Sequence, residues 1–232
     1  MPGTRRGFLG ALAALLASGW ATSSRADDLA PGEHPLGIEH DRDGVLYLPH
    51  GYRPGVATPL VVMFHGAGST GRAVSYAYPF ADEHGLIILA PDSRDDRTWD
   101  LVLGAYGPDA QFLSTALGQT LSRCSVDRQR LAIGGHSDGA SYALSFGIGA
   151  GDVFGHIMAF SPGVMSPVAA AGKPRVFISH GTKDPVMPID DTSRTFVPRL
   201  RRLGYDVTYR EYEGTHGAPA EIIQAGFDWL KL

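Results

Sequence analysis

The chain has 232 residues, of which 44% are hydrophobic and 19% are charged, a size and composition that suit one domain with a substantial core. Its formal net charge of −4 argues against nucleic acid or an anionic membrane surface as a partner. Cys124 is the only cysteine, which excludes an intramolecular disulfide.

The N-terminal segment resembles an export signal of the twin-arginine type. Arg5 and Arg6 precede an apolar stretch over 8–17, and small residues follow before an acidic pair. The motif departs from its usual form only at Gly10, where a lysine is typical. About ten strongly apolar residues are too few to cross a bilayer.

We therefore expect residues 1–26 to be a signal peptide that is cleaved after Ala26, and residues 27–232 to form the folded domain. The twin-arginine export machinery is then a partner. The mature protein is expected in the periplasm or secreted, without a stable membrane anchor.

The rest of the chain alternates short apolar runs with helical patterns. Asp43-Gly44 is a hairpin turn signal between 37–40 and 45–49, so we expect an antiparallel pair there. Further strands are expected at 59–66, 86–92, 130–135, 156–162, 175–181 and 207–214, and helices at 70–84, 109–123, 138–148, 190–203 and 218–231. This alternation predicts an α/β fold with a mostly parallel twisted sheet and helices on both faces.

One connection limits what can cover the sheet. Only residues 163–173 separate two of the expected strands, so we expect no lid domain there and an open site.

A possible nucleophile lies where a buried strand meets a helix. Gly135, Ser137 and Gly139 form the pattern Gly-x-Ser-x-Gly, which is weak alone in a chain with 30 glycines. At a strand-to-helix junction, however, two glycines allow a sharp turn that exposes the serine hydroxyl. The alternative, a simple helix N-cap, does not need glycine on both sides.

Several segments together resemble the α/β-hydrolase fold, in its small serine-esterase branch. They read "YLPHGYRPG…PLVVMFHGAG", "GGHSDGA", "HGTKDPVMP" and "GTHG", and they span roughly residues 40–232. The resemblance is to phospholipase/carboxylesterase and polyhydroxybutyrate-depolymerase-like esterases. It implies a serine carboxylesterase that needs no metal or organic cofactor.

The resemblance also implies a catalytic triad of Ser137, Asp184 and His216, which follow one another in the order typical of this fold. Asp190 and Asp191 are rivals for the acid, although they look like the start of a helix, where carboxylates favour the macrodipole. His216 would take the serine proton and return it to the leaving group, while Asp184 orients the imidazole.

The oxyanion hole is assigned to the backbone N–H groups of Ala67 and Asp138, because "HGAG" resembles the oxyanion loop of the family. A carboxylate beside an oxyanion is unfavourable, so we expect the Asp138 side chain to point away, towards solvent. His65 is interpreted as a structural residue of the loop.

The walls of the substrate pocket are predicted from loops beside these residues, and the candidates are Gly68, Trp99, Tyr106, Val186 and Met187. No histidine lies in a metal-binding motif, so no metal site is predicted. The expected substrate is a small-molecule or polymer-linked ester. The alternatives are a thioesterase or peptidase-like hydrolase with the same triad, and a non-catalytic protein that binds an envelope polymer.

Overall fold

The computed structural model describes residues 29–102 and 107–232. The expected signal peptide and Tyr106 lie outside the described residues. The strands are β1 (Gly32–Pro35), β2 (Gly44–Leu48), β3 (Thr58–Phe64), β4 (Ile87–Pro91), β5 (Val126–His136), β6 (His156–Phe160), β7 (Arg175–Gly181) and β8 (Val207–Tyr212). The helices are the 3₁₀ segment η1 (Gly71–Ala77), α2 (Tyr78–His84), α3 (Pro108–Arg123), α4 (Asp138–Gly149), α5 (Ser193–Arg202) and α6 (Ala220–Leu230).

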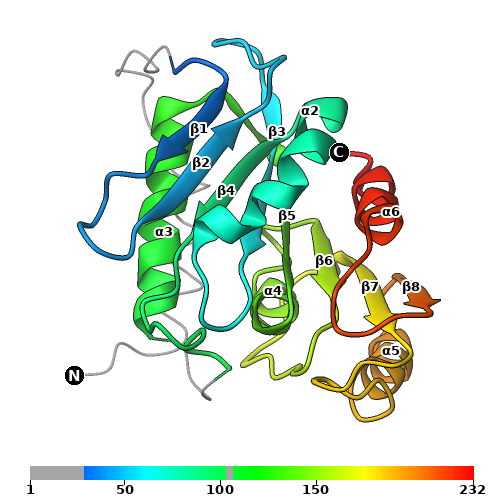
Figure 1. The fold of residues 1–232 in the computed structure, drawn as a ribbon. Coiled ribbons are helices and arrows are strands. Elements are labelled where there is room, and N and C mark those ends of the chain that lie inside the picture. The colour runs from blue at the N-terminus through cyan, green and yellow to red at the C-terminus, as the bar shows by residue number, and fades with distance from the viewer. Residues whose placement is uncertain (1–28, 103–106) are drawn as a thin grey trace.

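All eight strands form one sheet in the order β1-β2-β4-β3-β5-β6-β7-β8 (Figure 1). β1 pairs with β2 and β2 with β4 in antiparallel fashion, and every other pair is parallel. The mostly parallel sheet predicted from the sequence is therefore confirmed.

The sheet separates two hydrophobic cores. Alternate residues of each central strand point to opposite faces, so that Leu60 and Val62 of β3 join one core, while Val61 joins the other. Helices α3, α4 and α5 cover the first face, and η1, α2 and α6 cover the second (Figure 1). Burial on both faces explains why these strands are continuous apolar runs.

Two strand boundaries differ from the prediction. The first hairpin strand is β1, not residues 37–40, because the Asp43 carboxylate accepts hydrogen bonds from the backbone N–H groups of residues 37, 38 and 39 and folds them into a loop. β5 begins at Val126 rather than at 130, and residues 127–130 are polar and at least partly exposed, so they carry no hydrophobic signal.

The chain order places a crevice at the centre of the sheet. From β3 the chain goes outward to β4, and it then returns to β5 on the other side of β3. Loops that leave the carboxyl ends of β3 and β5 therefore diverge, and such a switch point is where ligands bind in open α/β sheets. Ser137 follows β5 at this point, and Ala67 follows β3. In the described residues, 163–173 contain no helix, in keeping with the absence of a lid domain.

Candidate active site

Ser137 occupies a strained turn between β5 and α4. Its backbone angles are φ 59° and ψ −122°, a conformation that costs about 1–3 kcal/mol for a residue with a side chain. A Cβ atom at Gly135 would lie 2.5 Å from the carbonyl carbon of Gly139, and one at Gly139 would lie 2.2 Å from the carbonyl oxygen of Phe64. Both glycines are therefore required by the close approach of three backbone segments.

The hydroxyl of Ser137 does not cap the helix. Ser137 stands at the N-cap position of α4, but its side chain makes no capping hydrogen bond. The oxygen instead lies 2.8 Å from Nε2 of His216, in the loop between β8 and α6. The N-cap interpretation is therefore wrong, because the serine hydroxyl is hydrogen-bonded to His216.

Asp184 completes a chain of hydrogen bonds. His216 Nδ1 lies 2.7 Å from Asp184 Oδ2, so Nδ1 carries a proton and donates a hydrogen bond to the carboxylate. This tautomer leaves the lone pair of Nε2 free to accept the proton of Ser137. The rival Asp190 forms an ion pair with Arg194 at the surface instead. The structure therefore brings together the three residues predicted from the sequence.

Asp184 is almost completely buried, with 6% of its surface exposed. Burial opposes its ionisation, but backbone N–H groups of Met187 and Val186, each 2.9 Å from Oδ1, and the hydrogen bond from His216 outweigh this effect. The pKa of Asp184 therefore lies below its usual value. The carboxylate stays charged, and it fixes the orientation of His216.

A second histidine, His180, also contacts Asp184 and was missed by the sequence analysis. Its Nε2 atom lies 2.8 Å from the carbonyl oxygen of Met187 and 3.2 Å from Asp184 Oδ2. Because Nε2 must donate to that carbonyl, Nδ1 is unprotonated and accepts the hydroxyl proton of Ser193 at 2.7 Å. Burial lowers the pKa of His180, which favours the neutral ring. His180 thus holds both the carboxylate and the loop that follows it.

The loop after β3 lies against Ser137. A Cβ atom at Gly66 would be 3.5 Å from the Cβ atom of Ser137. The amide of Ser137 itself donates to the carbonyl of Phe160, so it points away from this loop. In the described part of the chain, the N–H groups of Ala67 and Asp138 donate to no protein acceptor. They are thus available to a ligand oxygen, as the sequence analysis requires.

Buried contacts hold this loop in place. The backbone N–H of Ser93 donates to Nε2 of His65 at 3.0 Å, so Nδ1 carries the proton and donates to the carbonyl of Gly66 at 2.7 Å. Trp99 donates its indole N–H to the carbonyl of His65 at 2.9 Å. His65 therefore has the structural position that the sequence analysis assigned to it.

The expected position of the Asp138 side chain is wrong. Only 9% of Asp138 is exposed, and its carboxylate accepts a hydrogen bond from the hydroxyl of Thr98 instead of reaching solvent. A buried carboxylate at the first turn of α4 is stabilised by this donor and by the positive end of the helix dipole.

The predicted pocket residues are scattered. Trp99 is 1% exposed and packs against Phe64 in the core, so it supports the loop and does not line an open pocket. Gly68 donates its N–H to the carbonyl of Arg97, and Val186 is 59% exposed. The sulfur atom of Met187 fills the space beside Gly163. A Cβ atom at Gly163 would lie 2.2 Å from that sulfur atom.

His136, the residue before Ser137, is a further residue that the sequence analysis missed. Its ring centroid lies 5.1 Å from that of His216, and Nε2 lies 2.8 Å from the carbonyl oxygen of His216. Burial lowers the pKa of His136, so the neutral ring is favoured. The Gly-x-Ser-x-Gly pattern accepts any residue at its first variable position, so it predicts no role for the His136 side chain.

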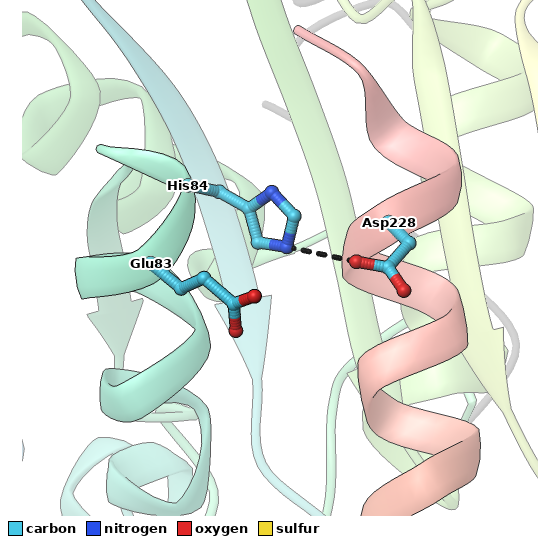
Figure 2. Close-up of side chains that lie close together, drawn as sticks. All are labelled: Glu83, His84 and Asp228. Atoms are coloured by element: carbon cyan, nitrogen blue, oxygen red, sulfur yellow. Dashed lines mark ion pairs between the residues drawn. The ribbon is translucent and has the colours of Figure 1, made fainter.

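One group of possible metal ligands lies elsewhere in the described residues. It consists of Glu83 and His84 of α2 and Asp228 of α6 (Figure 2). Their ligand atoms lie within 4.8 Å of one another, and His84 Nε2 is 3.2 Å from Asp228 Oδ1. The group joins the C-terminal parts of two helices, whereas Ser137 and His216 lie at the loops before helices α4 and α6.

Within the described residues, no helix has the length and apolarity needed to span a membrane.

Comparison with known proteins identifies the family of this chain. The sequence model of the Esterase family, described as "Putative esterase", matches residues 37–194, a range that includes Ser137 and Asp184. The chain belongs to the Esterase family. No sequence among the curated proteins matches this esterase.

Solved structures similar to this esterase have the same fold. Esterase PE8 is 26% identical with a TM-score of 0.64, over 79% of this chain and 98% of that one. FphF, a fluorophosphonate-binding serine hydrolase of Staphylococcus aureus, is 16% identical with a TM-score of 0.67, over 88% and 100%. A ferulic acid esterase from Anaeromyces mucronatus is 21% identical with a TM-score of 0.62, over 82% and 84%. The esterase thus has an α/β-hydrolase fold and is a carboxylic ester hydrolase.

The contacts of His180 generate a prediction about positioning. His180→Leu removes the donor to Asp184 and the Met187 loop, so we expect kcat to fall about tenfold to a hundredfold with KM within about twofold. His180→Gln keeps an amide N–H near the position of Nε2 and is expected to retain most of kcat. Rates are measured per active site, titrated with a fluorophosphonate.

This titration separates positioning from folding. If His180 were only part of the core, both variants would lose titratable sites and melt at lower temperature, while kcat per titrated site stayed at the parent value. That result would contradict the positioning role.

Proposed function

We propose that this esterase cleaves carboxylic esters through an acyl-enzyme on Ser137. The observation that carries the proposal is the unbroken chain of contacts from Asp184 through His216 to Ser137, at 2.7 and 2.8 Å. A serine hydroxyl is a poor nucleophile without an adjacent base, and that base needs a partner that fixes its tautomer. Both requirements are met by groups that the fold holds in place.

In this mechanism the Ser137 oxygen attacks the ester carbonyl while its proton moves to Nε2 of His216. The carbonyl oxygen becomes an oxyanion, which the free N–H groups of Ala67 and Asp138 stabilise. Collapse of this intermediate breaks the bond to the leaving oxygen, which takes the proton from His216. Water then attacks the acyl-enzyme by the same route, and His216 returns the proton to Ser137.

The substrate in this proposal is a small-molecule or polymer-linked ester. The short segment 163–173, which contains no helix, supports entry of bulky esters without movement of a lid there. The neighbour from Anaeromyces mucronatus carries the name ferulic acid esterase, which is one example of such a substrate class on this fold.

Removal of the nucleophile or base tests this function. Ser137→Ala and His216→Ala are each expected to lower kcat/KM on a short-chain ester by about 10⁴-fold, with melting temperatures close to that of the parent. Ser166→Ala is a matched control outside the hydrogen-bonded chain and should keep parental activity. Activity of either test variant within about tenfold of the parent would show that the nucleophile or base is assigned wrongly.

We also propose that the chain is exported by the twin-arginine route and that residues 27–232 are the mature enzyme. The support is the sequence pattern around Arg5 and Arg6, followed by a short apolar stretch and small residues. The mature enzyme would then act in the periplasm or outside the cell.

Replacing Arg5 and Arg6 together by lysine tests the route. The change keeps charge and hydrophobicity but removes the pair that the twin-arginine receptor reads, so precursor should accumulate in the cytoplasm. Cell fractions are compared by immunoblotting and esterase activity. Unchanged yield of exported enzyme would assign it to the general secretory route.

A further inference from the structure

A cavity of about 270 Å³ lies next to His216 on the face of the sheet that η1 and α6 cover. It is lined by Tyr76, His136, Gly217, Ala218 and Ile223. None of these residues was expected to line the substrate pocket. The lining is mostly apolar, and only Tyr76 and His136 contribute polar side chains to it.

Two of the residues that line the cavity are direct neighbours of reacting residues in the chain. Gly217 directly follows His216, and His136 directly precedes Ser137. The His136 ring also contacts His216, since Nε2 donates to the His216 carbonyl at 2.8 Å. Any group bound in the cavity therefore lies on the His216 side of the ester.

That side belongs to the leaving group. In the proposed mechanism the carbonyl oxygen lies at the N–H groups of Ala67 and Asp138, whereas the leaving oxygen must reach Nε2 of His216 to take its proton. The substituent on the leaving oxygen is thus directed past the His216 ring. His136 and Gly217, two of the residues that line the cavity, adjoin His216.

One polar group among the lining residues has no partner in the described part of the chain. The hydroxyl oxygen of Tyr76 is buried and makes no hydrogen bond. An unpaired buried polar group is destabilising, so a ligand that pairs with it gains affinity.

We propose that this cavity is the subsite for the alcohol portion of the ester, and that it selects an aromatic alcohol with a hydroxyl group at its far end. A cavity of about 150 Å³ holds a benzene molecule, so this one has room for an aromatic ring and a short linker. The ring packs on the apolar walls, and its hydroxyl pairs with the hydroxyl of Tyr76. This inference rests on the function proposed above.

A matched pair of substrates tests the polar recognition. We compare 2-(4-hydroxyphenyl)ethyl acetate with 2-phenylethyl acetate, whose reacting bonds are the same because the extra hydroxyl is remote. The parent enzyme is expected to prefer the hydroxylated ester by about threefold to tenfold in kcat/KM. Tyr76→Phe should bring this ratio close to one. Tyr78→Phe, whose hydroxyl bonds to Glu33 outside the cavity, is the control and should keep the parental ratio.

A second variant tests the apolar space. Ala218→Phe fills the cavity, so the ratio of kcat/KM for 2-phenylethyl acetate to that for ethyl acetate should fall at least about tenfold. This ratio is internal to each preparation, so loss of folded protein does not affect it. An unchanged ratio would overturn the proposal.

An acyl pair distinguishes the two sides of the ester. The esters are methyl 3-(4-hydroxyphenyl)propanoate and methyl 3-phenylpropanoate. If Tyr76→Phe changes the ratio for this pair and leaves the alcohol pair unaffected, the cavity binds the acyl group and the proposal is wrong. If neither ratio changes, the cavity is no subsite. Ser137→Ala is assayed on the same four esters. If it is inactive on all of them and either of these results is obtained, only the subsite is refuted, and the proposed function stands.

Discussion

The close approach of three backbone segments around Ser137 is the constraint on which the rest of the site depends. The start of α4 passes so near to the ends of β3 and β5 that positions 135 and 139 have no room for a side chain. This crowding forces Ser137 into its positive φ angle and turns its hydroxyl away from the helix. It also brings the loop after β3 beside the serine. One steric condition thus positions both the nucleophile and the amide groups that would bind the oxyanion.

Buried polar contacts then fix the groups that face this turn. Asp184 accepts hydrogen bonds from two backbone amides and from His216, and His180 donates to the same carboxylate and to the following loop. On the other side, His65 and Trp99 hold the loop after β3. Asp184, His180, His65 and Trp99 are buried, so leaving any of them unpaired is costly, and their contacts are specified together. Rigidity of this kind is what electrostatic stabilisation of a transition state requires.

The arrangement of strands and helices in this enzyme is predicted from the sequence more completely than its buried polar contacts are. Apolar runs and helical periodicity locate the sheet and most helices, because burial on both faces leaves a strong signal. β1 is missed because its four residues alternate between partly buried and exposed and include no long apolar run. Ser137, Asp184 and His216 follow from a motif and from chain order, and the structure brings them together, although their catalytic roles stay predictions.

The contacts that sequence cannot reveal join residues far apart in the chain. Thr98 lies 40 residues from Asp138, and its hydroxyl explains why that carboxylate is buried. His180 stands four residues before Asp184, a spacing that offers a weak local signal, but its partner Ser193 belongs to the next helix. Trp99 illustrates the opposite error, since an aromatic residue in a loop was assigned to a pocket and instead packs in the core. Only the fold decides between these environments.

The central claim, a covalent intermediate on Ser137, is tested most directly by locating the modified atom. Purified enzyme is treated with a fluorophosphonate, digested and analysed by tandem mass spectrometry. We expect one adduct per chain, carried by the Ser137 side chain, and no adduct when His216 is replaced by alanine. An adduct on a neighbouring serine such as Ser141 or Ser161, or an unmodified protein that still hydrolyses esters, would contradict it.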